Sequence, residues 1–141
     1  MQLGNPSFTH YDIMNFTNEI FELYFKENIQ FERNDYSSEK MGWFVLEYTY
    51  KPRGYKIIFE HDRLRFSIRI IDLDGSHTSI FRMLEDIKIN TALEKENIKK
   101  AIEMLEKELE KDDICFYISR DDKQYKKVDG KLIRIKYPFM K

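Results

Sequence analysis

The sequence predicts an α+β fold in which an antiparallel sheet packs against two amphipathic helices. Two observations support this prediction. Residues 43–71 contain three successive segments in which apolar and polar residues alternate, and apolar residues recur at helical spacing before and after them. A sheet that is apolar on one face must be covered, and only these two helical segments are long enough to cover it. The fold class therefore follows from the pattern, whereas no function does.

Strands are predicted at 43–50, 55–60 and 64–70, joined by tight turns at 51–54 and 61–63. Alternation places the apolar side chains of the three strands on one face. These are Phe44, Leu46, Tyr48, Tyr50, Tyr55, Ile57, Phe59, Leu64, Phe66, Ile68 and Ile70. We expect this face to form one wall of the core.

The two helices are predicted from spacing and from start signals. Thr9 and Asp12 resemble a capping box, and apolar residues follow at Ile13, Phe16, Ile20, Leu23 and Tyr24. Thr91 and Glu94 give a second such signature, which starts a long helix at about 91–112. Its apolar stripe comprises Leu93, Ile98, Ala101, Ile102, Leu105 and Leu109.

The rest of the chain predicts shorter elements within one domain that spans residues 1–141. A strand at 29–34 is followed by a loop at 34–40, and a short helix begins behind Thr78 or Ser79. A strand at 114–118 precedes a C-terminal hairpin whose arms, 125–128 and 131–137, flank Asp129-Gly130.

Charge is segregated along the chain although the net charge is only −1. Residues 1–40 carry three Lys/Arg against seven Asp/Glu (−4), and residues 114–141 carry eight against three (+5). The overall balance gives no drive toward nucleic acid or an anionic membrane. The basic C-terminal segment either packs against acidic parts of the chain or contacts a partner.

Cys115 is the only cysteine and lies in an apolar run, so we expect a buried thiol and no intrachain disulfide. No secretory leader pattern opens the chain and no apolar run approaches about 18 residues. These features predict a soluble cytoplasmic protein without membrane contact. The abundance of Lys, Ile, Asn and Glu is compatible with a bacterial source.

The common catalytic, metal and nucleotide motifs are missing from the sequence. His10, His61 and His77 have no metal-ligand spacing, and His61-Asp62 is typical of turn chemistry. The five glycines are isolated, so they build no phosphate loop, and there is no Gly-x-Ser-x-Gly elbow. We predict no catalytic residue, no metal site and no cofactor, while a site assembled from distant residues stays open.

Two surfaces are candidate binding sites. The polar face of the 43–71 strands carries the candidate partner-binding residues Trp43, Lys56, Ile58, Glu60, Arg65 and Arg69. Alternatively, a Glu60–Arg65 ion pair and a covering helix or hairpin explain this face. The basic hairpin offers Lys123, Lys126, Lys127, Lys131 and Arg134 as nucleic-acid contacts, although the aromatic pattern of an RNA-recognition motif is not present.

Three classes of function therefore compete. The favoured class is a non-enzymatic protein-binding module, in its most concrete form a bacterial immunity or antitoxin-like protein that blocks a partner with an acidic surface. The second is a nucleic-acid-associated protein that uses the C-terminal hairpin. The third is an enzyme or small-ligand-binding protein. The sequence does not predict an oligomeric state.

Overall fold

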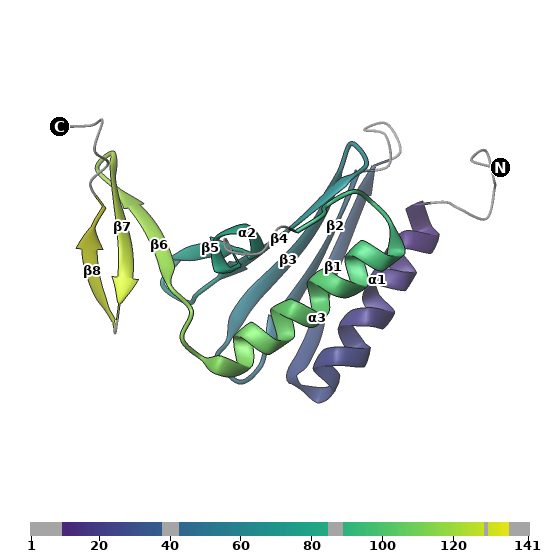
Figure 1. Ribbon diagram of the computed structural model, residues 1–141, viewed down its shortest axis with the longest axis horizontal. Coiled ribbons are helices and arrows are strands. Elements are labelled where there is room, and N and C mark those ends of the chain that lie inside the picture. Colours follow the sequence, from purple (N-terminus) through teal and green to yellow (C-terminus); the bar gives the residue numbers. More distant parts are fainter. Residues whose placement is uncertain (1–9, 38–42, 85–88, 129, 136–141) are drawn as a thin grey trace.

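The computed structural model describes residues 10–37, 43–84, 89–128 and 130–135, and it has the predicted α+β fold. Its eight strands form one antiparallel sheet in which sequence order is also spatial order (Figure 1). The strands are β1 (Ile29–Ser37), β2 (Trp43–Tyr50), β3 (Tyr55–Asp62), β4 (Arg65–Ile71), β5 (His77–Ser79), β6 (Phe116–Arg120), β7 (Lys123–Val128) and β8 (Lys131–Arg134). The helices are α1 (His10–Phe25), the 3-10 turn η1 (Lys26–Asn28), α2 (Ile80–Met83) and α3 (Lys95–Lys111).

The predicted core face of β2–β4 is confirmed. Leu46 lies opposite Phe59, which lies opposite Ile68, and all three side chains are buried. Neighbouring rows repeat the arrangement, because side chains alternate between the two faces of each strand. Leu64 is the exception, since it lies in the β3–β4 turn with φ 65° and is exposed.

Helices α1 and α3 lie side by side across this core face (Figure 1). The stripe of α3 is buried as predicted, with Leu105 completely inaccessible. From α1, the ring of Phe21 lies 4.3 Å from the ring of Tyr48, which joins the helix to the centre of the sheet. Most of the hydrophobic core is therefore placed between these two helices and β2–β4.

The start of the long helix was predicted wrongly. α3 begins at Lys95, and its N-cap residue Glu94 makes no side-chain capping bond. Thr91 is buried and its carbonyl accepts the N–H of Phe66, so this segment pairs with the start of β4. Tertiary pairing has replaced the capping box. The proposed cap at Thr9 lies outside the described residues.

Two further boundaries differ from the prediction. β1 continues to Ser37, so the first part of the predicted loop at 34–40 is strand. β5 was missed, because its three residues are too few to show an alternating pattern. Ser79, one of the two predicted caps, does cap α2 by accepting the N–H of Arg82.

Strands β6, β7 and β8 form what we call the C-terminal meander, which extends beyond the helix layer in Figure 1. It joins the rest of the sheet through one β5–β6 register pair, His77 with Tyr117. β6 begins at Phe116, so Cys115 precedes the strand and is half-buried rather than buried as predicted. Of the predicted hairpin turn, Gly130 has the expected positive φ of 79°, and Asp129 lies outside the described residues.

Candidate functional site: the outer face of the sheet

We call the face of β1–β4 opposite α1 and α3 the outer face. Neither long helix covers it, and Lys56, Arg65 and Arg69 are exposed there. Trp43 and Ile58 are half-buried. The structure therefore brings all six predicted partner-binding residues onto one surface, which neighbouring strands β2, β3 and β4 build together.

Glu47 is the electrostatic centre of the outer face. Its two carboxylate oxygens lie 3.1 Å from Arg33 Nε and 3.4 Å from Lys56 Nζ. The carboxylate is nearly buried while both cations stay half-exposed, so one anion is shared between β1 and β3. Lys56 is consequently held in place, and part of its charge is compensated within the chain.

Glu60 does not form the ion pair with Arg65 that the sequence suggested. Register places Ser67 opposite Glu60, and Asp62 opposite Arg65. Glu60 instead accepts a hydrogen bond of 2.7 Å from the indole N–H of Trp43. This bond fixes the indole on the outer face, where a rigid aromatic ring makes an effective contact surface.

Arg65 and Arg69 are the exposed cations of β4 on this face, and Asp62 lies opposite Arg65 in register. They share one side of β4 with Ser67 between them, and no ion pair joins either to a carboxylate of the described residues. Arg65 donates a hydrogen bond to the Thr91 hydroxyl, at 3.3 Å. A hollow of about 190 Å³ beside Arg65 is lined also by Glu60, Asp62, Phe66 and Ser67, so both charge signs border it. Such a surface can accept carboxylate groups from a partner.

The five predicted nucleic-acid residues are divided between the two sides of the C-terminal meander. Phe116, Lys127 and Leu132 occupy one register row, whereas Tyr117, Lys126 and Ile133 occupy the next. Lys123, Lys127 and Arg134 thus share one side, and Lys126 and Lys131 share the other. They do not form one continuous basic stripe.

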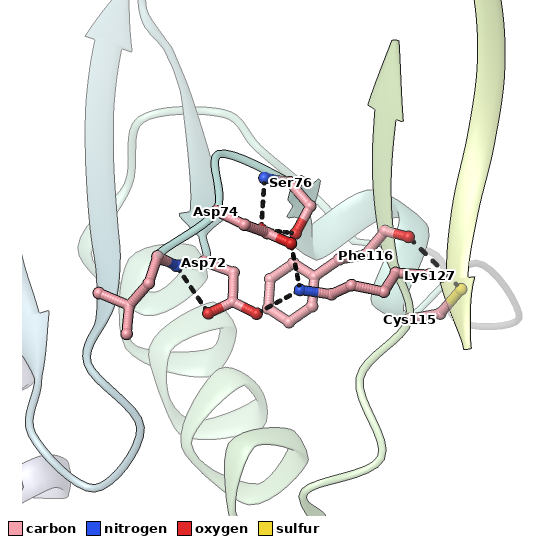
Figure 2. A network of polar contacts seen from close by, with 7 residues as sticks. Asp72, Asp74, Ser76, Cys115, Phe116 and Lys127 are labelled. Atoms are coloured by element: carbon pink, nitrogen blue, oxygen red, sulfur yellow. Dashed lines mark hydrogen bonds and ion pairs between the residues drawn. The ribbon is translucent and has the colours of Figure 1, made fainter. Parts of the chain in front are cut away.

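Lys127 is held between two carboxylates of the β4–β5 loop, as Figure 2 shows. Its Nζ lies 2.6 Å from Asp72 and 3.0 Å from Asp74, in the loop between β4 and β5. Asp74 also accepts hydrogen bonds from the backbone and hydroxyl of Ser76, and these bonds together with Lys127 lower the pKa of Asp74. Burial alone would lower the pKa of Lys127, but its two carboxylate partners outweigh burial and raise it. This cluster attaches the meander to the sheet.

A hollow of about 430 Å³ lies between the meander and the end of α3. Residues distant in sequence meet there, including Arg53, Asp72, Asp112 and Lys127. Arg53 pairs with Asp112 at 2.9 Å, and Lys127 pairs with Asp72. The charged groups of this hollow are therefore engaged mainly with each other.

Among the described residues, no group of three His, Cys, Asp or Glu side chains is placed to hold a metal ion. His61 is fully buried in β3, and its Nε2 accepts the N–H of Leu64 across the hairpin turn. In the part of the chain described, none of the helices has the length and apolar character to cross a membrane.

Comparisons of the chain with protein-family models, with curated proteins and with solved structures found no match.

Sequence reasoning missed two parts of the site. The role of Arg33 depends on a β-bulge between Phe31 and Arg33, which places Arg33 opposite Glu47. The Lys127 cluster joins segments more than 50 residues apart, which no local pattern connects. Strict alternation at 29–34 groups Arg33 with Ile29 and Phe31 on the core face, so the sequence pattern predicted the wrong face for Arg33.

Proposed function

We propose that the chain is a protein-binding module that engages an acidic surface of a partner through the outer face of its sheet. The observation that supports this is the pair Arg65 and Arg69, which are exposed and have no ion pair with a carboxylate among the described residues. Ile58 lies opposite Arg69, and Trp43 lies on the same face of β2. Arginine and aromatic side chains are enriched in protein interfaces, and exposed arginines favour an acidic partner surface.

The finer form of the proposal is a bacterial immunity or antitoxin-like role in the cytoplasm. The partner would then be an enzyme that loses activity when the outer face covers its functional surface. The support is indirect: the chain is small and its charge is segregated. Inhibition of the captured partner is the result that separates this role from simple adaptor binding.

The test is a charge reversal with a matched control. Arg65→Glu with Arg69→Glu changes the outer face, whereas Lys99→Glu with Lys100→Glu makes the same change in net charge on the exposed side of α3. Affinity capture from lysate of the source organism is followed by mass spectrometry, and circular dichroism checks the fold. We expect the parent and the α3 variant to retain a partner that the outer-face variant loses.

Equal recovery of that partner by all three proteins would contradict the proposal. The Arg65 side chain also donates a hydrogen bond to Thr91, so its replacement can weaken the start of β4. Arg69→Glu alone resolves this, because the Arg69 side chain makes no hydrogen bond or ion pair in the part of the chain described. It should reduce partner recovery without lowering the unfolding temperature by more than a few degrees.

Small-ligand binding is a second candidate because of the 430 Å³ hollow, whose size suits a small molecule. Its charged groups form the pairs Arg53–Asp112 and Lys127–Asp72, so the class that fits is a zwitterionic ligand whose two charges replace a partner in these pairs. A thermal-shift screen with amino acids and short peptides tests this candidate. A ligand that stabilises the parent but not Arg53→Ala would support it, and the absence of any such ligand would count against it.

A further inference from the structure

Strand β1 is an exposed edge of the sheet. Within the described residues it pairs with β2 alone. Six consecutive residues of the strand are exposed: Gln30, Phe31, Glu32, Arg33, Asn34 and Asp35. An edge of this kind presents backbone N–H and C=O groups to which another strand can add.

Aromatic rings border the same edge on its helix side. Tyr11 of α1 stacks on Tyr36 with 4.8 Å between ring centroids, yet Tyr11 remains 58% exposed. Phe31 contacts the buried Tyr48 edge-on and is 44% exposed. An added strand would remove part of this aromatic surface from water, so the edge offers apolar burial as well as backbone hydrogen bonds.

We propose that two copies of this chain associate by antiparallel pairing of their β1 strands, with Asn34 on the twofold axis and Arg33 opposite Asp35 of the second copy. The inference does not depend on the proposed function. A twofold axis perpendicular to the sheet keeps the helices of both copies on one face, and it would set both outer faces side by side on the other.

Charge selects this register. The proposed geometry requires facing residues to come from the same side of the strand, because antiparallel neighbours share a face. Shifting the register in one direction would place Arg33 opposite Arg33 of the second copy. Shifting it in the other direction would place Asp35 opposite Asp35 of the second copy. Only the register centred on Asn34 brings Arg33 and Asp35 together, and symmetry makes this pair twice.

Arg33 can serve both partners. Its Nε–H is directed to Glu47 at 3.1 Å, while the guanidinium group has four further N–H donors. Its side chain is 58% exposed, so these donors can reach the neighbouring copy. The bulge lies on the N-terminal side of Arg33, and pairing of residues 33–37 with β2 is regular. The bulge and the edge charges therefore limit pairing to one short register rather than prevent it.

Cysteine crosslinking tests the register. In a Cys115→Ser background, Asn34→Cys should form a disulfide-linked dimer under mild oxidation, because directly opposed Cα atoms lie about 4.5–5.5 Å apart. Arg33→Cys and Asp35→Cys should crosslink far less, because the two equivalent cysteines of a dimer would then be diagonal neighbours, about 7–8 Å apart. Lys56→Cys on the central strand controls for random collision. Preferred crosslinking at residue 33 or 35, or equal crosslinking at all positions, would overturn the proposal.

Charge exchange tests the pairing in the full chain without added cysteine. Sedimentation equilibrium should show a dimer for the parent and a dissociation constant about tenfold higher for Arg33→Asp, because two attractive pairs become repulsive. Adding Asp35→Arg should restore dimerisation, although the bond to Glu47 stays lost. Recovery of the dimer in the exchange variant would show that Arg33→Asp acts on strand pairing and not on folding. A parent that stays monomeric at high concentration, or an exchange variant that fails to recover, would refute the inference.

Discussion

Strands β1–β4 and the C-terminal meander belong to one sheet, yet different interactions hold them in the molecule. β2, β3 and β4 pair along nearly their whole lengths, and two helices cover the apolar face they share. The meander meets β5 at one register pair, and its own strands carry mostly exposed or half-buried side chains. Burial of apolar area stabilises the first region, whereas the second depends on a few specific contacts.

The meander contacts the rest of the molecule through a few side chains. Phe116 packs edge-on against Tyr55 at 5.0 Å, and the guanidinium of Arg82 lies 4.0 Å from the centre of the Tyr117 ring. Lys127 adds its ion pairs to the β4–β5 loop. A region held by few contacts opens at lower free energy than the core, so the two regions should differ in local stability.

The largest expected effect is in the helix-covered region. Leu105→Ala should lower the free energy of unfolding by about 2–5 kcal/mol, because it leaves a cavity where the side chain is fully buried. Leu23→Ala on the exposed side of α1 is the matched control and should change stability little. Urea denaturation measures both. A loss below about 0.5 kcal/mol for Leu105→Ala would contradict the assigned core.

The attachment of the meander should respond to one side chain. Lys127→Met leaves Asp72 and Asp74 without their cation, so the opening free energy of β6 and β7 should fall by on the order of 1–3 kcal/mol. Hydrogen exchange should show faster amides in the meander and unchanged protection in β3. Lys123→Met in the same strand, at an exposed position, is the control.

If protection fell equally in β3 and the meander, the two regions would unfold as one unit, and the contrast between them would be wrong.

The same contrast explains how far the sequence predicted the structure. Periodicity gave the three central strands and the α3 stripe, because their burial follows regular alternation and helical spacing. It failed where a distant contact decides the structure. Thr91 pairs with Phe66 instead of capping α3, and β5 is a strand only because β4 lies beside it.

The candidate site was predicted to a similar extent. Alternation placed Trp43, Lys56 and Arg69 on one face, since that needs only the strand period. The partners of those side chains depend on register between strands. The predicted Glu60–Arg65 pair was wrong for this reason, because hairpin register sets Ser67 opposite Glu60.

The smallest expected effect is the pH dependence of the Lys127 cluster. It concerns only the meander, because Asp74 belongs to the cluster that attaches the meander and not to the hydrophobic core. Hydrogen bonds from Ser76 and the nearby Lys127 hold the pKa of Asp74 below its ordinary value of 3.8. A carboxyl whose pKa is lowered on folding stabilises the native state fully above its unfolded pKa, and this contribution is lost as the pH falls toward the lowered pKa.

The difference in unfolding free energy between the parent and Asp74→Asn should therefore stay constant from pH 7 to about 4.5 and shrink below that. Urea denaturation at pH 7, 5, 4 and 3 measures it, with Asp62→Asn as a control at an exposed carboxylate outside the cluster. A difference that does not change between pH 5 and pH 3 would mean that Asp74 does not stabilise the native state through its charge.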